Sequence, residues 1–392
     1  KSVAQNKSQS KVVAHWVNNW LTPTQNWIYS QVQALRTWQP VVFTNRVNGL
    51  YPEDLVVNWE QQPVWRRFLD RVFMKVGLRQ RPVIVTKGIR KYRIPILHSH
   101  FAQHGARNAI LAQREGLKHV VSVYGADVSK NVTGNSEKTQ ALKRMFRMAD
   151  AIVCEGPAMA ERVCKLGCAR RKVHVIAIPI DFSALPFQKR RVTKNTPLQI
   201  LIAGTFTEKK GIPDALEAIG RLRKRKPDFR IRVTVVGDAV RAADIMEKRR
   251  ILAKVQQWNL QDVVDFLGYV KPDKLRGLYY THDLLLSPSI TAENGDTEGG
   301  APVTLSEAAA TGLPIVSTWH CDIPEVVKHR FNGFLVPERD VDGLVEKLFE
   351  LAEDLEKREM FGRNGAIYVR KRHSRENSTL QLASLYDSLI TR

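Results

Sequence analysis

Short hydrophobic runs alternate with longer amphipathic stretches along the whole chain. In the first half, the runs that we interpret as strands are residues 11–16, 40–44, 82–86, 95–100, 119–125, 151–156 and 172–180. In the second half, they are residues 199–204, 230–238, 263–270, 283–289, 313–318 and 332–337. The stretches between them, such as 26–37, 213–225 and 302–312, have the apolar spacing of helices. Strands that are apolar throughout and alternate with helices predict parallel sheets covered on both faces.

A break at residues 181–197 divides this pattern in two, because it holds two prolines, a basic run and no periodicity. The predicted fold class is therefore α/β, with two doubly wound, Rossmann-like domains in series, and a ligand is expected at the carboxyl ends of the strands. We place the domains at residues 1–185 and 186–372, followed by a helix within 373–392. The polar residues 1–10 lack a hydrophobic segment, so we interpret them as an unstructured lead-in and not as a signal peptide.

The balance of charges narrows the choice of partners. The 392 residues include 61 Lys and Arg against 39 Asp and Glu, which gives a net charge of +22. Such an excess favours nucleic acid, an anionic membrane surface or phosphate-bearing small molecules as partners. The four cysteines form no C-x-x-C pair, which argues against a zinc cage and favours free thiols in a reducing cytoplasm. No run of 18 apolar residues is present, so no transmembrane helix is predicted.

A glycine-fronted helix start lies in residues 296–318, DTEGGAPVTLSEAAATGLPIVST. After Glu298 come Gly299 and Gly300, which let a ligand approach the backbone closely. The unpaired N–H groups of the helix start then form an anion site. Glu307 follows within the helix, where a carboxylate can accept hydrogen bonds from a pair of sugar hydroxyls. The alternative is a glycine turn before an ordinary amphipathic helix.

A second loop of this kind lies in residues 201–218, LIAGTFTEKKGIPDALEA. The strand ends at Gly204, and Lys209 and Lys210 precede the next helix. A lysine at such a turn suits a diphosphate as a point charge, although two solvated lysines are the alternative. Two anion loops in one domain support each other and predict a phosphate-bearing ligand.

These loops resemble those of the retaining glycosyltransferases of family 4, which have the two-domain GT-B fold. That family carries G-R-x-x-x-K-K-G after a strand, and later two glutamates spaced E-x7-E before a G-x-P-V-V strand. The corresponding segments here read GTFTEKKG and EGGAPVTLSEAAATGLPIV. Two further segments, HSHFAQHGA and VVSVYGADVS, are similar to the branch that builds colanic-acid-type and other bacterial exopolysaccharides. The resemblance implies two domains that face each other across a cleft, with the carboxy-terminal helix crossing back to the amino-terminal domain.

Three positions depart from the family pattern. Thr205 stands where the family has an arginine, so one of two cations for the diphosphate is missing. Glu298 and Glu307 are nine residues apart, where the family spacing is eight. The family motif H-G-x-D reads Tyr124-Gly125-Ala126-Asp127, which replaces an imidazole by a phenol.

The resemblance also implies the roles of individual residues. Lys210 would hold the donor diphosphate, Glu307 the ribose and Glu298 the transferred sugar, while Tyr124 and Asp127 would face the reacting carbon. The full donor-binding set is Gly204, Thr205, Lys209, Lys210, Gly237, Gly299, Gly300, Ala301 and Glu307. The catalytic set is Tyr124, Asp127 and Glu298, and the acceptor-side set is His100 and His104. The donor is expected to be a UDP- or GDP-sugar, with no metal required, and front-side attack would retain the anomeric configuration.

The activity that follows from the resemblance is transfer of a hexose-type sugar to a saccharide or polyprenyl-linked saccharide in bacterial surface polysaccharide synthesis. Two alternatives stay open. One is a sugar-nucleotide epimerase on the same scaffold. The other is a non-catalytic basic protein that binds lipid or RNA through a degenerate donor site, which the substitutions at Thr205 and Tyr124 would permit.

Residues 65–93 contain ten basic residues and a single acid, Asp70. Within them Trp65, Phe68, Val72 and their neighbours form one apolar helix face beside a cationic one. Such a helix can dock on an anionic membrane, which suits a lipid-linked acceptor. We therefore expect a cytoplasmic protein that can lie on the inner face of the plasma membrane, and no nucleic acid partner. A core-facing helix with a solvated basic face, or a nucleic acid site, is the alternative.

Two groups of residues have side chains of the kinds that bind metal ions. Asp340-Val341-Asp342 is a D-x-D sequence, but it opens a helical stretch, so we interpret Asp340 or Asp342 as a helix N-cap. His98, His100 and His104 lie at a strand end and the loop after it. We interpret these histidines as lining the cleft near the acceptor, with a metal cluster as the alternative.

Overall fold

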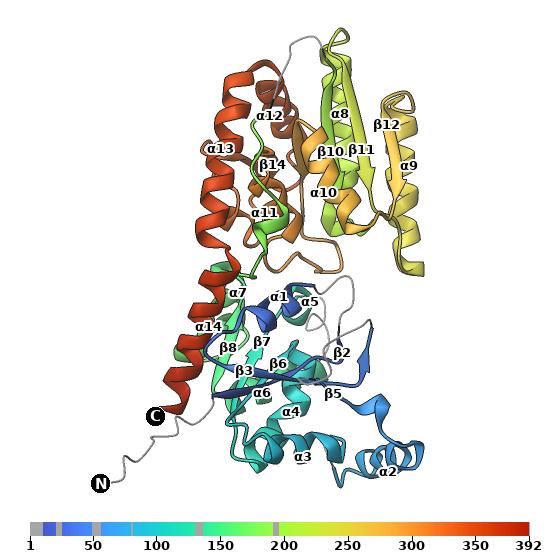
Figure 1. Ribbon diagram of the computed structural model, residues 1–392. Coiled ribbons are helices and arrows are strands. Elements are labelled where there is room, and N and C mark those ends of the chain that lie inside the picture. Colours follow the sequence, from blue (N-terminus) through green and yellow to red (C-terminus); the bar gives the residue numbers. More distant parts are fainter. Residues whose placement is uncertain are drawn as a thin grey trace, which may run out of the picture. The chain divides into compact units, whose positions relative to one another are not determined.

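The computed structural model describes residues 11–20, 26–48, 56–79, 81–129, 136–190 and 196–391. These residues divide into two compact units, each built on a parallel sheet (Figure 1). Unit 1 comprises residues 1–155, 160–179 and 375–392, and unit 2 comprises residues 156–159 and 180–374. The lead-in that we expected at residues 1–10 lies outside the described residues.

Unit 1 has seven parallel strands in the order β5-β3-β1-β6-β7-β8-β9. The strands are β1 (Val12–Trp16), β3 (Gln39–Thr44), β5 (Val56–Asn58), β6 (Ile96–His100), β7 (Lys118–Ser122), β8 (Ala151–Cys154) and β9 (Val173–Val175), and β2 (Asn19–Trp20) pairs with β4 (Arg46–Val47) apart from them. The helices are α1 (Asn26–Ala34), α2 (Val64–Lys75), α3 (Val83–Lys91), α4 (Ala102–Arg114), α5 (Gly125–Val128), α6 (Ser136–Met148), α7 (Pro157–Lys165) and α14 (Arg375–Ile390), and the first three residues of α7 belong to unit 2.

Alternate residues of the unit 1 strands pack against different helices. Ala14 and Trp16 of β1 join a cluster with Val85 of α3 and Leu111 of α4. Val13 of the same strand points to the other face, where it joins a cluster with residues of α14. The sheet is therefore covered on both faces, as the apolar strand pattern predicts.

One predicted strand is wrong. Residues 82–86 read as a strand because they are apolar and β-branched, but they begin the helix α3. Pro82 stands at the N-cap, and Asp70 Oδ1 accepts the Val83 N–H at 3.2 Å, which satisfies a backbone donor that the first turn leaves unpaired. Val85 and Ile89, four residues apart, are then buried together. The helical period outweighs the strand preference of the individual residues.

Unit 2 has six parallel strands in the order β12-β11-β10-β13-β14-β15. The strands are β10 (Leu198–Ala203), β11 (Ile231–Val236), β12 (Val264–Gly268), β13 (Leu284–Ser287), β14 (Ile315–Thr318) and β15 (Gly333–Val336). The helices are α8 (Ile212–Arg225), α9 (Ile245–Gln257), α10 (Pro272–Thr281), α11 (Val303–Ala310), α12 (Val341–Glu353) and α13 (Leu355–Arg372). One face of the sheet packs on α8, α9 and α12, and the other packs on α10 and α11.

Among the described residues, none of the helices combines the length and the apolar character that crossing a bilayer requires. The helix expected near the end of the chain is α14, and it packs within unit 1. Its Tyr386 Oη lies 2.6 Å from His98 Nδ1, and Asp387 accepts a hydrogen bond from Trp38 Nε1 at 3.0 Å.

Candidate functional site

The carboxyl ends of three neighbouring strands of unit 2 meet backbone to backbone. Gly237 after β11 has a φ of +130°, and a Cβ there would lie 1.8 Å from the carbonyl oxygen of Gly204 after β10. Gly211 has a φ of +61°, and a Cβ there would lie 1.9 Å from the carbonyl oxygen of Pro288 after β13. Only glycine fits these two positions, because any side chain would collide with backbone atoms that cannot move aside. The loops that carry the predicted donor residues are thus held close together.

A buried ion pair joins two of these loops. Lys210 Nζ lies 2.9 Å from Glu298 Oε1 and donates to Glu298 Oε2 at 3.1 Å. Ser289 Oγ donates to Glu298 Oε1 at 2.9 Å. The stem of Lys210 packs against Gly204, where a Cβ would lie 3.2 Å from Lys210 Cδ. The side chains of Lys210 and Glu298 are only 18% and 7% exposed, so solvent screens their attraction weakly.

The environment keeps Glu298 charged. Burial disfavours its carboxylate, but the charges of Lys210 and Lys209, with hydrogen bonds from Lys210 and Ser289, outweigh burial and lower the pKa of Glu298. Lys209 holds the same loop from its other side, since its Nζ lies 3.4 Å from Asp296 Oδ1 and donates to the Thr297 carbonyl at 3.0 Å. Two consecutive lysines therefore bind residues 296–298 through ion pairs and hydrogen bonds.

His320, which none of the sequence motifs indicated, contacts the backbone of Glu298. His320 Nε2 lies 3.1 Å from the Glu298 amide nitrogen, and His320 Nδ1 lies 2.6 Å from Glu338 Oε1. An amide can only donate, so Nε2 carries a lone pair and Nδ1 carries the proton. Burial lowers the pKa of His320, but its contacts with Cys321 and Glu338 raise the pKa by more. The ring is nevertheless neutral when it accepts the Glu298 amide hydrogen, because a protonated ring has no lone pair on Nε2. The signal in the sequence that could have indicated His320 is its own position, two residues after the predicted strand 313–318.

Cys321 lies beside this histidine, with its Sγ 3.2 Å from His320 Nε2. Its φ is +46°, in the left-handed region that residues other than glycine seldom adopt. The residue as a whole is partly exposed. The loop after β14 thus places a thiol next to the histidine that holds the Glu298 backbone.

The second glutamate lies in the first turns of α11. Tyr279 Oη of α10 donates to Glu307 Oε2 at 3.0 Å. Burial raises the pKa of Glu307, by more than the Tyr279 hydrogen bond and the charge of Arg276 lower it. Pro302, at the N-cap of α11, provides no side-chain cap for the helix. Gly299 and Gly300, just before it, are buried, whereas Ala301 is partly exposed.

The predicted catalytic residues of unit 1 form a separate group. Asp127 Oδ2 accepts the amide hydrogens of Ala102 at 2.9 Å and Tyr124 at 3.1 Å, so this carboxylate caps α4 and α5. Burial raises the pKa of Asp127 to about 6, although those two amides lower it. Tyr124 Oη lies 2.9 Å from His100 Nδ1, so the structure brings these two predicted residues together.

His100 belongs to a buried histidine cluster. Ligand-type atoms of His15, His98 and His100 lie within 4.8 Å of one another. His15 Nδ1 lies 3.0 Å from His100 Nε2, and His98 Nε2 lies 2.8 Å from Ser122 Oγ. The ring nitrogens of His98 and His100 are therefore engaged in hydrogen bonds. His104, which we expected in the loop after the strand, is instead buried within α4, because the helix begins only two residues after β6, and it lies outside this group.

The structure confirms the interpretation of the D-x-D sequence. Asp340 Oδ1 accepts the Gly343 N–H at 2.9 Å and caps α12, while Asp342 Oδ1 lies 2.8 Å from Arg221 Nη1. The two carboxylates thus serve a helix start and a surface ion pair. Thr205, which replaces the arginine of the family motif, lies 3.4 Å from Thr207, measured between the hydroxyl oxygens.

Two family models match the chain. The model described as "Glycosyl transferases group 1" covers residues 186–367, and the model described as "Glycosyltransferase Family 4" covers residues 25–184. Together they account for most of both units.

The curated relatives that the chain resembles also carry the names of glycosyltransferases. The chain is 32% identical over 260 residues to Escherichia coli WcaL, which carries the name of a colanic acid biosynthesis glycosyltransferase, with 66% of this chain and 61% of that protein matched. It is 29% identical over 274 residues to the amylovoran biosynthesis glycosyltransferase AmsK of Erwinia amylovora, with 69% of this chain and 65% of that protein matched. The match spans less than two thirds of the length of these relatives.

Solved structures share the fold over nearly the whole chain. Anabaena HepE, solved with UDP and glucose, has a TM-score of 0.74 at 15% identity, with 96% of this chain and 99% of that chain covered. Sucrose-phosphate synthase of Thermosynechococcus elongatus has a TM-score of 0.75 at 19% identity, with 97% and 99% covered. These likenesses, with the two parallel sheets, confirm the predicted GT-B fold class.

Proposed function

Since the chain belongs to glycosyltransferase family 4, we propose that it transfers a hexose-type sugar from a nucleotide-diphosphate sugar to a saccharide acceptor in bacterial surface polysaccharide synthesis. The names of WcaL and AmsK support the polysaccharide assignment. The UDP and glucose in the HepE structure support a nucleotide-sugar donor. UDP- and GDP-sugars are the expected donors.

The observation that carries this proposal is the buried Lys210–Glu298 pair at the carboxyl edge of the unit 2 sheet. An ammonium group has three hydrogens, and Glu298 can engage two of them, so the third is left for a phosphate oxygen. The pair also fixes where the cation points, which lowers the entropy lost when a ligand binds. Glu298 is then a positioning residue for Lys210 as well as a candidate ligand for sugar hydroxyls.

The start of α11 supplies the second source of positive charge. Its N-cap residue provides no side-chain cap, and the partly exposed Ala301 leads into it. Backbone N–H groups and the helix dipole favour an anion at this position. We assign the donor diphosphate to this helix start and Lys210, which compensates for the arginine missing at Thr205.

The remaining donor contacts follow from the geometry of Glu307. Tyr279 donates to one carboxylate oxygen, so the other can accept a ribose hydroxyl. Gly204 and Gly237, which meet backbone to backbone, keep side chains out of the space beside them. Lys209 is engaged by Asp296 and Thr297, and we assign it to holding the loop.

We propose transfer with retention by front-side attack. The acceptor oxygen bonds to the anomeric carbon as the bond from that carbon to the diphosphate oxygen breaks, and the acceptor proton moves to a diphosphate oxygen. Negative charge grows on the diphosphate in this step, and Lys210 and the α11 start stabilise it in place. Neither a protein nucleophile nor a metal ion is required in this scheme.

On unit 1, we assign Tyr124, His100 and His104 to the acceptor half. His100 orients the Tyr124 hydroxyl through their hydrogen bond. Asp127 acts there by fixing the backbone.

The acceptor is proposed to be a saccharide carried on a polyprenyl lipid, and unit 1 is proposed to dock on the anionic inner face of the plasma membrane. The exposed apolar residues of α2 and the ten basic residues within 65–93 support this location. Anionic lipid attracts such a segment until salt screens the contact.

A transfer assay tests the proposed function. The protein is incubated with UDP- and GDP-sugars and short saccharide acceptors, and NMR follows the new anomeric signal. We expect one nucleotide to raise the melting temperature and its sugar to be transferred with the donor's anomeric configuration. Inverted product would contradict the retaining mechanism. Neither binding nor transfer with any nucleotide would favour the non-catalytic alternative.

A further inference from the structure

The apolar face of α2 points away from the core of unit 1. Trp65, Phe68, Val72 and Val76 lie on one helix face and are 59%, 63%, 40% and 61% exposed. The opposite face carries Asp70, which is 5% exposed. A core-facing helix, one of the alternatives left open by the sequence, is therefore excluded. Four large apolar side chains on one exposed stripe are unusual for a surface that meets only water.

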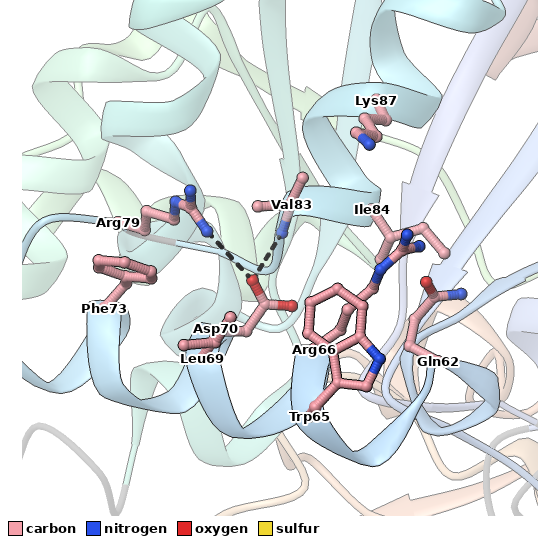
Figure 2. Close-up of a pocket in the computed structure, with 10 residues that line it drawn as sticks. All are labelled: Gln62, Trp65, Arg66, Leu69, Asp70, Phe73, Arg79, Val83, Ile84 and Lys87. Atoms are coloured by element: carbon pink, nitrogen blue, oxygen red, sulfur yellow. Dashed lines mark hydrogen bonds and ion pairs between the residues drawn. The ribbon is translucent and has the colours of Figure 1, made fainter.

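Asp70 joins α2 to α3 and is fully engaged in doing so. Its carboxylate accepts the Trp59 Nε1–H at 3.2 Å. It also accepts the Val83 N–H at 3.2 Å and lies 3.4 Å from Arg79 Nη1 (Figure 2). The single acid of residues 65–93 is thus neutralised within the fold. Of the ten cations of this segment, Arg79 pairs with Asp70 and Arg90 pairs with Glu115. The remaining cations leave this segment with a net positive charge that an anionic partner can meet.

A pocket of about 310 Å³ lies between the two helices, next to the exposed stripe. Trp65, Leu69 and Phe73 line it from α2, and Ile84 lines it from α3 (Figure 2). The charged lining residues are Arg66 of α2, Lys87 of α3, and the paired Asp70 and Arg79. The volume is at the lower end of the range of small-molecule sites. Since Arg79 is paired with Asp70, Arg66 and Lys87 are the lining cations outside that ion pair, and together with the apolar walls they match an amphipathic anion.

We propose that this pocket binds the phosphodiester head group of one anionic phospholipid while the stripe of α2 inserts among the acyl chains. Arg66 and Lys87 would share the phosphate oxygens, and the glycerol would lie against Trp65 and Leu69. The acyl chains would then follow Phe68 and Val72. This inference rests on the proposed membrane docking and adds a specific head-group site to it.

The charges favour a lipid over a second copy of the chain. A dimer through this face would bring two segments with ten basic residues and one acid each into contact, and the repulsion would oppose it. The basic residues are Arg66, Arg67, Arg71, Lys75, Arg79, Arg81, Lys87, Arg90, Lys91 and Arg93. An anionic bilayer offers the opposite charge along the whole segment.

The test separates the head-group site from general attraction to the surface. The full chain is titrated with short-chain phosphatidylglycerol kept below its micelle concentration, and with vesicles of phosphatidylglycerol and phosphatidylcholine. The pocket variant is Arg66→Gln with Lys87→Gln. The control, Lys75→Gln with Lys91→Gln, removes the same charge outside the pocket. A stripe variant, Phe68→Ser with Val72→Ser, removes the apolar contact.

We expect saturable binding of the short-chain lipid at one site, weakened at least about tenfold in the pocket variant and less than about twofold in the control. Vesicle binding should fall in both charge variants at low salt, and in the stripe variant at every salt concentration. Nucleotide binding should be unchanged in all variants, which shows that they fold and separates this site from the donor site.

Three results would overturn the proposal. Equal binding of the short-chain lipid by the wild type and the pocket variant would place the lipid elsewhere. Vesicle binding without any short-chain lipid binding would remove the head-group site and leave the docking. A dimer in sedimentation that the stripe variant abolishes would assign the face to a second copy.

Discussion

Lys210 Nζ and Glu298 Oε1 are 2.9 Å apart, although the two residues are separated by 88 positions in the chain. The pair is mostly buried, and removing one partner leaves the other charge uncompensated. We predict that Lys210→Met lowers the free energy of unfolding by about 3 kcal/mol. The double variant with Glu298→Met should recover most of that loss, because it leaves no buried charge. Urea unfolding of the single and double variants measures the coupling, and two additive losses would argue against a coupled pair.

Gly237 and Gly277 form a matched pair for testing the packing of the loops. At Gly237 a Cβ would lie 1.8 Å from a carbonyl oxygen at a φ of +130°, whereas at Gly277, within α10, it would meet nothing within 4 Å. We predict that Gly237→Ala destabilises the protein by more than about 2 kcal/mol. Gly277→Ala should stabilise it by about 0.5–1 kcal/mol, because alanine favours helix. Thermal unfolding compares the two, and a neutral Gly237→Ala would show that the strand ends are loosely packed.

Unit 1 is predicted to lose stability as the pH falls below about 6.5. Burial lowers the pKa of His15 to about 3 and, as the main cause, that of His119 to about 4, and it lowers the pKa values of His98 and His100 well below their usual range. The unfolded chain therefore binds protons below about pH 6.5 that the folded chain does not bind. Each such proton lowers the free energy of unfolding by about 1.4 kcal/mol per pH unit. Asp127 acts in the opposite direction, because its raised pKa makes the folded state take up a proton first, but it is one group against several.

Urea midpoints between about pH 7.5 and 5.5 measure this dependence. Six of the eight tryptophans precede residue 66, so fluorescence reports mainly on unit 1. His15→Phe removes one titrating ring, so its stability should fall less steeply with acid, even if its stability at neutral pH is lower. A midpoint that does not vary with pH would mean that water reaches the buried histidines.

Cys321 is predicted to report on the donor site. Its Sγ lies 3.2 Å from His320 Nε2, which also contacts the Glu298 amide, so a ligand over residues 298–300 should cover the thiol. Cys164 is also partly exposed but lies on α7, and it serves as the internal control. Iodoacetamide labelling with peptide mass mapping should show that the nucleotide sugar slows modification of Cys321 and not of Cys164. Equal rates with and without bound ligand would move the site away from this loop.

Much of the fold could be predicted because a strand that is buried on both faces is apolar at successive positions. Val12, Val13 and Ala14 are all apolar, and the structure buries them on opposite sides of one sheet. An N-cap at Asp340 or Asp342 could also be predicted, since a cap depends on residues only three positions away, and the structure shows that Asp340 is the cap. Residues 82–86 misled the prediction because their helix is capped by Asp70, a contact that the local pattern does not contain.

The candidate site was harder to predict because its contacts are long-range. The motifs indicated Lys210 and Glu298 separately, but only the fold shows that they pair. His320 supports Glu298 from the next strand end, and nothing near Glu298 in the sequence announces it. Likewise, the spacing of Trp65 and Phe68 predicts an apolar stripe but not whether the core covers it.

The central claim is that Lys210 and the start of α11 bind a diphosphate, and calorimetric titration tests it most directly. UDP and GDP are titrated against the wild type, Lys210→Met and Lys224→Met, an exposed lysine of α8, with the matching monophosphates alongside. We predict that one diphosphate binds the wild type and Lys224→Met at least about tenfold more tightly than its monophosphate, and that Lys210→Met loses this preference. Equal affinity of Lys210→Met and the wild type for the diphosphate would contradict the account.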